Sequence, residues 1–445
     1  TLGIAIVLPD LGQVAGSGDS LTLRLRRYVL LCLFASLAAQ TFTLPLLTYY
    51  FGRVSVMGFA LNLIALPMVT LIVTAGLEAS IAVLISPSLA KIFIGGAALL
   101  SRWLIAIATW ATQTLDATIV TGTPSAWQVT IALVVVGWFA VRFERMRNIS
   151  KAAAIGLVWL ALVMPFTSAG SEHLEMTFLY VGHGDATLIR SGDWTLLVDT
   201  GPRGQWSDAA QTHILPALFV KGISRLDMVV ITHPHSDHFG GLESLMQAIE
   251  IGEIRVSTFE GDDDYCHVLD KAKARGIPVR RFCYPDSITL GRLTVTVLSP
   301  DSLLAQVDED PNLTSIVMKL TYGAFEALLC ADAPREVQRN LIERWPDLRV
   351  TLLKVPHHGR ADAMDETFLQ TVNPSIAVVS AGPPRGGHAE AIAHLEGSGL
   401  EVVTTYHDGA IEVTTDGEWC QIGCFGSQRT LTIDNLRPTP TIGLD

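Results

Sequence analysis

The sequence predicts a multi-pass α-helical membrane segment followed by a water-facing α/β domain, and three observations support this fold class. The 445-residue chain is 49% hydrophobic with a mean hydropathy of +0.39, which is high for a soluble protein of this size. Residues 1–170 carry 10 Lys and Arg against 5 Asp and Glu, whereas the remainder carries 21 against 38. Long apolar runs dominate the first part and short alternating runs the second. The two parts therefore face different solvents, lipid and water.

Five apolar runs in the first part predict membrane helices, since about 20 apolar residues are needed to cross a bilayer. They extend over residues 28–50, 56–77, 93–110, 127–141 and 152–165. Residues 79–87 are apolar but too few to cross, so we expect a re-entrant or interfacial segment there. Thr1 already lies in an apolar run without a preceding basic region. We therefore expect the sequence to begin partway through a membrane helix.

Basic residues predict the orientation of this segment. Arg24, Arg26 and Arg27 precede the first full helix, and a second basic cluster at residues 142–151 separates the last two helices. The positive-inside rule assigns both clusters to the cytoplasm, and four crossings between them satisfy the parity. The last helix then leads outward. The sequence thus predicts an inner (cytoplasmic) membrane protein whose water-facing domain lies in the periplasm or outside the cell.

Short strands alternate with helical patterns after residue 170, which is typical of a layered α/β domain with a central sheet. Strands are expected at residues 174–181, 186–190, 195–199, 226–232, 293–298, 313–321, 325–330, 351–355, 375–380 and 411–415. Helices are expected at residues 209–220, 335–343, 366–372 and 389–395. We predict three parts: transmembrane helices at 1–168, the α/β domain at 169–426 and a loose C-terminal tail at 427–445. Four cysteines are candidates for disulfides in an oxidising compartment, namely Cys266, Cys283, Cys420 and Cys424.

The strongest chemical signal is Thr-His-Pro-His-Ser-Asp-His-Phe-Gly-Gly at residues 232–241, directly after an apolar strand. His233 and His235 can face one cation, while Asp237 and His238 can face a second. Imidazole suits zinc, manganese and iron, and a carboxylate helps to hold a second hard cation. The alternative, a solvated polar loop, explains poorly why three of the chain's 12 histidines and an aspartate share this spacing.

Two further strand ends offer ligands. Asp332 ends an apolar strand and could bridge two ions, or it could cap the helix that follows. His357 and His358 follow another strand. We expect one of the two to be a ligand, with His357 preferred and His358 either orienting it or contacting substrate. Asp185 and Asp199 are expected to orient other groups rather than to bind metal themselves.

These motifs resemble those of the ComEC-type competence family, whose hydrolase domain belongs to the metallo-β-lactamase superfamily. Asp-Thr-Gly at residues 199–201, the histidine motif, Asp332 and His357 follow the order of the superfamily's metal motifs. Four segments resemble motifs of the competence family itself. Three lie in the α/β part: Val-Gly-His-Gly-Asp-Ala at 181–186, Asn-Leu-Thr-Ser at 312–315 and Leu-Lys-Val-Pro-His-His-Gly-Arg at 353–360. The fourth, Leu-Asn-Leu-Ile-Ala-Leu-Pro at 61–67, lies in the membrane part.

The resemblance implies an αββα sandwich attached to a multi-helix channel, and a role in DNA uptake during natural transformation. Single-stranded DNA would pass through the channel, while the metal-dependent phosphodiesterase domain, a nuclease, would degrade the non-transported strand. It implies two divalent ions, with zinc or manganese expected, held by His233, His235, Asp237, His238, Asp332 and His357. The implied partners are DNA, the lipid bilayer, other proteins of the competence machinery and a second copy in a homodimer.

The sequence departs from the family pattern at several positions. His183 replaces a Gln, and Arg360 replaces a Ser. His388 lies where the family has Gly-His-Pro, but Ala389 follows it here. The superfamily's third-motif histidine has no counterpart, and Asn312 is the nearest candidate at that position. We expect these changes to affect metal occupancy and rate more than the fold.

For catalysis we expect Asp237 and Asp332 to flank a water molecule, with His388 donating a proton or binding phosphate. His388 could equally be a surface residue at the start of a helix. Arg360 or Arg385 could contact a phosphate oxygen, or be solvated. The net charge of −17 after residue 170 argues against a broad basic DNA footprint. Two other interpretations therefore stay open: hydrolysis of another phosphate ester, such as a phosphorylcholine-like or lipid-headgroup ester, and a channel with a catalytically idle domain.

Overall fold

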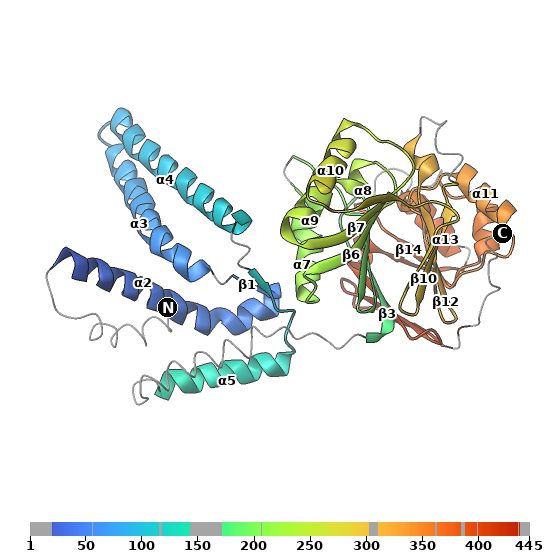
Figure 1. The fold of residues 1–445 in the computed structure, drawn as a ribbon, viewed down its shortest axis with the longest axis horizontal. Coiled ribbons are helices and arrows are strands. Elements are labelled where there is room, and N and C mark those ends of the chain that lie inside the picture. Colours follow the sequence, from blue (N-terminus) through green and yellow to red (C-terminus); the bar gives the residue numbers. More distant parts are fainter. Residues whose placement is uncertain are drawn as a thin grey trace. The chain divides into compact units, whose positions relative to one another are not determined.

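The computed structural model describes residues 20–55, 57–114, 118–142, 171–205, 207–301, 310–360, 363–383, 388–397, 399–434 and 436. The chain divides into two compact units. One comprises residues 1–167 and 219–223, and the other comprises residues 168–218 and 224–445. Figure 1 shows the first unit as long helices and the second as strands with helices around them.

The N-terminal unit is helical in its described part, with one small sheet. Its elements are α2 (Leu21–Phe51), β1 (Arg53–Ser55), α3 (Gly58–Ala82), α4 (Pro87–Thr114), β2 (Thr118–Val120) and α5 (Ala126–Arg142). Among the described residues, three helical segments are long and apolar enough to cross a membrane: Thr22–Phe51, Ala60–Ala82 and Pro87–Ala111. Their outward faces carry exposed apolar side chains such as Leu71, Val73 and Ile105. Such faces are stable against lipid, where backbone groups must be paired within the helix.

The observed helices correct part of the sequence prediction. The spans expected at residues 28–50, 56–77 and 93–110 correspond to α2, α3 and α4. The span at 127–141 corresponds to α5, whose 17 residues are at the short end of what crosses a bilayer. At residues 79–87, where we expect a re-entrant or interfacial segment, residues 79–82 complete α3 and Pro87 already begins α4. The apolar stretch is thus the tip of a helical hairpin. The span expected at 152–165 lies outside the described residues.

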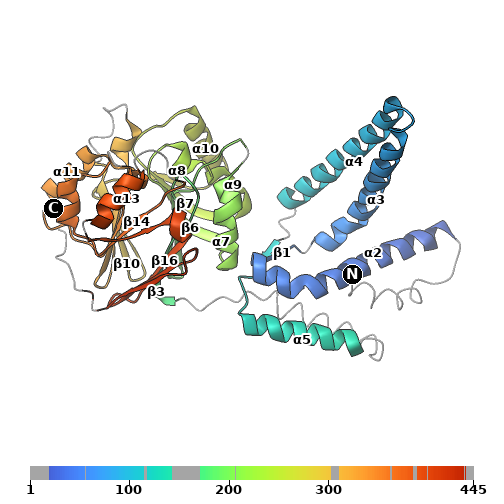
Figure 2. The same cartoon turned by 180° about the vertical axis from the view of Figure 1, so that it is seen from behind.

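The C-terminal unit contains two sheets that face each other (Figures 1 and 2). The nine-stranded sheet has, in spatial order, β18 (Thr430–Ile433), β17 (Cys420–Cys424), β16 (Ile411–Thr415), β3 (Ser171–Phe178), β4 (Thr187–Gly192), β5 (Trp194–Val198), β6 (Arg225–Ile231), β7 (Glu250–Val256) and β8 (Val279–Arg281). The seven-stranded sheet has β15 (Glu401–Thr404), β14 (Ile376–Val379), β13 (Leu352–Lys354), β12 (Phe325–Leu329), β11 (Val317–Tyr322), β10 (Leu293–Ser299) and β9 (Ser287–Leu290). In each sheet four consecutive strands are parallel, β5 to β8 and β12 to β15.

Helices cover the outer faces of both sheets. Beside the nine-stranded sheet are a π-helix (Ala210–Ile214), α7 (Leu215–Val220), α8 (Ser236–Phe239), α9 (Leu242–Ala248) and α10 (Asp263–Ala274). Beside the seven-stranded sheet are α11 (Arg335–Arg344), α12 (Glu366–Val372) and α13 (His388–Gly397), with the short α14 (Thr405–Asp408) after β15. Helix, sheet, sheet and helix layers follow one another, and the predicted αββα sandwich is confirmed.

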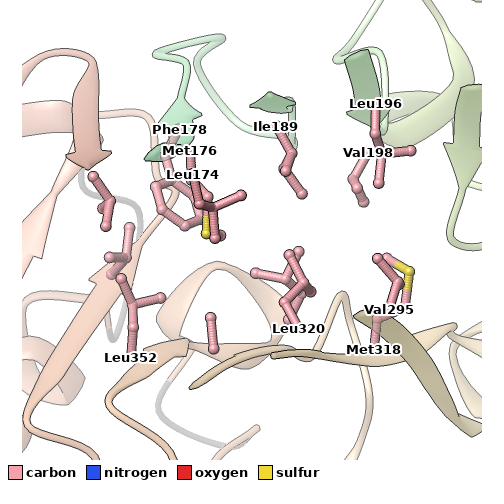
Figure 3. Packing of buried hydrophobic residues seen from close by; sticks show 14 of the residues in the cluster. Leu174, Met176, Phe178, Ile189, Leu196, Val198, Val295, Met318, Leu320 and Leu352 are labelled. Carbon is pink, nitrogen blue, oxygen red and sulfur yellow. The ribbon is translucent and has the colours of Figure 1, made fainter. Parts of the chain in front are cut away.

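Alternating apolar residues of both sheets fill the space between them. Leu174, Met176 and Phe178 of β3 point toward the facing sheet, from which Leu320 and Leu352 point back (Figure 3). All five are almost completely buried. Because successive side chains of a strand alternate between faces, every second residue reaches this core. Full burial of one such side chain contributes about 1.5–3 kcal/mol, so this layer fixes how the two sheets are positioned.

Three local expectations differ from the structure. The strand expected at residues 313–321 begins only at Val317, because Pro311–Thr314 form a 3-10 helix whose first turn is capped by the Asp310 side chain. Part of the tail expected to be loose forms β18, which pairs with β17 and packs Leu431 against the core. All six cysteines are free, so the candidate disulfides do not form in this structure.

Candidate metal centre

The histidine motif begins where β6 leaves the nine-stranded sheet. Residues 228–234 are buried, so the strand delivers its C-terminal end into the protein rather than to the surface. Thr232 and His233 follow the strand directly, and α8 then turns the chain so that Asp237 and His238 face back toward it. A strand end followed by one short helical turn thus presents four candidate ligands within six residues.

Asp199, at the end of the neighbouring strand β5, holds this loop in place. Its carboxylate accepts hydrogen bonds from the backbone N–H of Thr232 at 2.8 Å and from the Thr232 hydroxyl at 2.9 Å. The same carboxylate lies 2.8 Å from Nδ1 of His238. Asp199 has a φ of 62°, a left-handed conformation that costs energy in a non-glycine residue and occurs where surrounding contacts enforce it. These contacts fit the orienting role that we expect for Asp199 from the sequence.

The seven-stranded sheet contributes a carboxylate and two imidazoles. Asp332 follows β12 and is 2% exposed. His357 and His358 follow β13, and both have left-handed backbone angles, with φ of 50° and 55°. The backbone N–H of His357 donates to the carbonyl of Ala331 at 2.9 Å, which joins the two strand ends. Asp332 does not cap the next helix, because Pro334 occupies the N-cap position of α11.

Side chains from the two sheets meet at Asp332. Its carboxylate lies 3.4 Å from Nε2 of His238 and 3.8 Å from Nε2 of His233. It also lies 3.6 Å from Nε2 of His358 and 3.8 Å from Nε2 of His357. Two groups of mutually close ligand atoms result, each within 4.8 Å: one with His233, His235 and Asp332, the other with Asp185, His238, Asp332 and His358. Asp332 is the member that they share.

Buried atoms without hydrogen-bond partners show that these groups fit a cation. Nδ1 of His238 is taken by Asp199, and Nδ1 of His358 lies 3.1 Å from the carbonyl of Ser380. Both imidazoles therefore carry their proton on Nδ1 when neutral and direct an Nε2 lone pair inward. Within the described structure, neither Nε2 has a hydrogen-bond partner, and the same holds for Oδ1 of Asp332 and of Asp185. Unpaired buried acceptors are costly, and a metal ion would satisfy all four.

The charged groups of the cluster shift the pKa values of Asp332, His238 and His358 in the direction opposite to burial. Burial would raise the pKa of Asp332, but the nearby His358 and His238 hold it well below its usual range. Burial would lower the pKa of His238, but Asp332 and Asp199 raise it well above its usual value, and Asp332 and Asp185 likewise raise the pKa of His358. Burial lowers the pKa of His233. The protein itself thus supplies negative charge around imidazoles, as a cation site requires.

Comparisons with known proteins agree with this geometry. Residues 1–146 match the family model of the competence protein, and residues 179–382 match that of the metallo-β-lactamase superfamily. The N-terminal part of the chain is thus similar to competence proteins, and the C-terminal part is similar to the metallo-β-lactamase superfamily. The metallo-β-lactamase domain indicates a metal-dependent hydrolase, and the competence-protein domain with its apolar helices indicates a membrane protein.

Individual relatives cover most of the chain at low identity. ComE operon protein 3 of Bacillus subtilis is 24% identical over 400 residues, which are 85% of this chain and 51% of that protein. Recombination protein 2 of Haemophilus influenzae is 27% identical over 270 residues, 58% of this chain and 31% of that protein. The metallo-β-lactamase fold protein YhfI of Bacillus subtilis has a crystal structure that is 18% identical, with a TM-score of 0.40, covering 54% of this chain and 99% of that one. The chain spans about half the length of ComE operon protein 3.

The C-terminal unit also brings Asp185 to the centre, through a close backbone approach. Asp185 lies in a loop between β3 and β4, next to Gly184, whose φ is 138°. A Cβ on Gly184 would lie only 2.4 Å from the carbonyl oxygen of Asp237. Only glycine allows this distance, so the loop can close against the histidine motif.

Lys354 is the residue whose role the sequence did not suggest. It ends β13, is 3% exposed, and forms an ion pair with Oδ2 of Asp185. Burial would lower its pKa, but Asp185 and Asp332 raise it, so the ammonium stays charged. The available signal was a lysine closing the run Leu352-Leu353-Lys354, since a charge at the end of a buried strand needs a partner. Lys354 occupies one oxygen of Asp185 and leaves Oδ1 facing His358 at 3.7 Å.

Asp237, Asn312 and His388 are predicted site residues that belong to neither of the two close groups of ligand atoms. Asp237 is half-buried, and its carboxylate lies 3.5 Å from Nε2 of His358. Asn312 lies in the 3-10 helix, and its buried Oδ1 has no hydrogen-bond partner among the described residues. His388 begins α13, but its side chain lies outside the described part of the chain. The two close groups contain His358, not His357, which is the reverse of the preference from the sequence.

Proposed function

We propose that the chain acts in DNA uptake, as a membrane channel for single-stranded DNA with a metal-dependent phosphodiesterase that degrades the non-transported strand. One observation carries the enzymatic part: two groups of His and Asp ligand atoms share Asp332 at the joint edge of two sheets. The competence-protein domain that precedes them in the same chain supports DNA as the substrate. The basic flanks of the helices support an inner-membrane location with the hydrolase domain outside the cytoplasm.

In this proposal the centre holds two divalent ions, zinc or manganese. His233 and His235 with Asp332 would hold one ion, and His238 and His358 with Asp332 the other. Asp237, half-buried at the opening, would complete the second set. Mixed imidazole and carboxylate ligands suit these metals. Such ions, when bound, lower the pKa of water and offset negative charge on phosphate oxygens.

The surrounding residues would position the ligands and the strand. Asp199 fixes His238 through Nδ1, and Ser380 fixes His358 in the same way. Lys354 holds Asp185 in place through an ion pair. Asp237 is the carboxylate that solvent can reach, so it would accept a proton from an attacking water. His388 is the proposed group for the departing oxygen.

A cleavage assay on the full chain in detergent tests the proposal. Labelled single- and double-stranded DNA, lipid-headgroup esters and phosphorylcholine esters would be offered with Mn²⁺ or Zn²⁺ after chelation and reloading. We expect DNA cleavage that is lost in His235→Ala and Asp237→Ala but kept in Asp347→Asn, an exposed aspartate after α11. If the protein cleaved only the small esters, a small phosphate ester would replace DNA as the proposed substrate. A protein that binds no metal and cleaves nothing would reduce the domain to a structural part of a channel.

A further inference from the structure

Helix α4 carries an arginine in the middle of a segment that is long enough to cross a membrane. Arg102 belongs to the apolar span Pro87–Ala111. At 1.5 Å per residue, it lies about 13 Å from Ala111, the nearer end of that span. Long basic side chains reach the aqueous interface from positions close to a helix end, so the Arg102 guanidinium stays at the depth of the hydrocarbon core. A charge at this depth is costly in lipid and faces a polar path or a partner.

Arg102 is part of a narrow stripe along α4 that contains only small or polar side chains. At 3.6 residues per turn, every residue between positions 91 and 109 that lies within about 40° of Arg102 around the helix axis is of this kind. These residues, named here the basic stripe, are Lys91, Gly95, Ala98, Arg102, Ala106 and Thr109. The stripe is about 27 Å long, close to the thickness of roughly 30 Å of a bilayer's hydrocarbon core. It therefore offers a continuous track across the membrane.

The basic stripe lies on the side of α4 that points away from α3. The two helices pack against each other as a hairpin (Figures 1 and 2). The side of α4 opposite the stripe carries its buried and partly buried residues, namely Ala90, Phe93, Ala97, Leu100, Leu104, Ile107 and Ala111. The residues of the stripe are all exposed. Packing between these two helices thus leaves the stripe uncovered.

The described helices of the N-terminal unit provide no carboxylate at the depth of Arg102. Of the five acidic residues in positions 1–170, only Glu78 lies within one of these helices. Glu78 is close to the end of α3, and Lys91 is close to the start of α4, so both lie near the tip of the hairpin. Arg102 lies about 16 Å further along α4 than Lys91. Within the described part of the chain, the Arg102 side chain has no hydrogen bond or ion pair.

A polyanion fits the basic stripe. One carboxylate from another helix would satisfy Arg102, but it would not require a track as long as the bilayer is thick. A strand of nucleic acid presents phosphates along such a length and is attracted by aligned cations. Trp103 and Trp110 stand beside the stripe and are 58% and 55% exposed. Cations next to aromatic rings are the combination with which proteins hold single-stranded nucleic acid.

We propose that the basic stripe of α4 lines the path of single-stranded DNA through the membrane, with a backbone phosphate on Arg102 and bases against Trp103. Gly95, Ala98 and Ala106 leave room beside the helix for the strand. This inference rests on the proposed function, because it takes the transported polymer to be DNA. It assigns the helix face that lines the channel, which the proposed function leaves open.

The accessibility of introduced cysteines tests whether the stripe faces water. Ala98→Cys and Ala106→Cys lie on the stripe, and Ala108→Cys, about 120° from Arg102 and also exposed, is the matched control. The full chain in phosphatidylcholine vesicles would be treated with a charged, membrane-impermeant thiosulfonate. Peptide mass spectrometry measures labelling at each site, so the native cysteines stay in place. Since the thiolate is the reacting form and needs water, we expect the stripe cysteines to react at least about tenfold faster than the control.

Protection by DNA identifies what occupies the stripe. Oligothymidylate, added with a chelator so that it is not cleaved, should slow labelling of both stripe cysteines and leave Ala108→Cys unchanged. Adding Arg102→Gln should raise the concentration for half-protection by about tenfold and lower its salt slope by about 0.7, because one phosphate contact is lost. Arg102→Lys should keep most of the protection. Equal melting temperatures of these variants show that the fold is unchanged.

Three results would overturn the proposal. The first is slow labelling of all three sites, which means that lipid or protein covers the stripe. The second is fast labelling that DNA does not slow. The third is protection by phosphatidylglycerol in the vesicles without DNA, which makes a lipid headgroup the occupant.

Two further results separate this proposal from the proposed function. If Arg102→Gln took labelled oligothymidylate into vesicles at the wild-type rate, the channel would stand and the stripe would be overturned. If DNA protected the stripe in a protein that never cleaves DNA, the stripe would stand and the nuclease would be overturned.

Discussion

The two sheets of the C-terminal unit contribute to the candidate metal centre in different ways. The nine-stranded sheet supplies a compact motif, residues 233–238, held by a single neighbouring carboxylate, Asp199. The seven-stranded sheet supplies Asp332 and His358 from two strand ends, with left-handed backbone at Ala331, His357 and His358. The first contribution is local in sequence, and its left-handed residue is Asp199, outside the motif itself. The second depends on strained turns that only the assembled sandwich can maintain.

If metal binding depends mainly on the seven-stranded sheet, Asp332→Asn should lower metal affinity more than any other substitution considered below. Asp332 is the shared member of both ligand groups, and the change keeps its shape while removing its charge. Loss of residues that only orient ligands typically costs about 10–100-fold in metal affinity or activity, so loss of a shared ligand should exceed 100-fold. Isothermal titration with Mn²⁺ and Zn²⁺ measures this. Affinity within tenfold of the Asp347→Asn control would mean that the first sheet holds the metals without Asp332.

The adjacent histidines sharpen the comparison within the second sheet. His358 is buried and lies 3.5 Å from Asp237 and 3.6 Å from Asp332, whereas His357 is half-buried and lies 3.8 Å from Asp332. We expect His358→Ala to lose at least about tenfold more metal affinity than His357→Ala. Metal content after dialysis against a graded chelator compares the two. The opposite order would restore the preference drawn from the sequence.

The first sheet is tested through Asp199. Asp199→Asn keeps an acceptor for Thr232 but no longer stabilises the Nδ1 proton of His238, so the Nε2 lone pair loses its fixed direction. We expect metal affinity to fall by about 10–100-fold, less than for Asp332→Asn. Asp193→Asn, in the exposed turn between β4 and β5, is the matched control. An Asp199 effect larger than that of Asp332 would reverse the ranking of the two sheets.

The pH dependence of metal affinity tests ligands from both sheets at once. The pKa values of His238 and His358 are raised in the metal-free protein by the carboxylates beside them. Protons therefore compete with metal below these raised pKa values, and affinity should increase as pH rises from 6 to 8. Each displaced proton contributes up to about tenfold per pH unit. The pKa of His233 is lowered, so this residue should add nothing. Chelator competition at several pH values measures the slope, and a flat profile would contradict the proposed ligands.

The sequence by itself determined that one part of the chain faces lipid and the other faces water. It also determined the layered α/β fold of the second part and the position of the histidine motif. Hydrophobic length and charge distribution separate lipid-facing helices from the α/β domain, because burial of apolar groups and of charges follows solvent directly. Residues 233–238 could be recognised as ligands since their spacing around one turn already brings them together. The αββα arrangement itself was predicted by family resemblance, not by periodicity.

Only the tertiary structure decided how distant residues combine. The pairing of Lys354 with Asp185 spans 169 positions, and no local pattern encodes it. That His358 rather than His357 lies in a close group of ligand atoms depends on two left-handed residues that turn the chain after β13. A cavity lined by Arg335, Arg339 and Arg360 likewise forms where α11 meets the segment after His358. Sequence periodicity reports which side of an element is buried, whereas side-chain direction at a strand end depends on contacts from other strands.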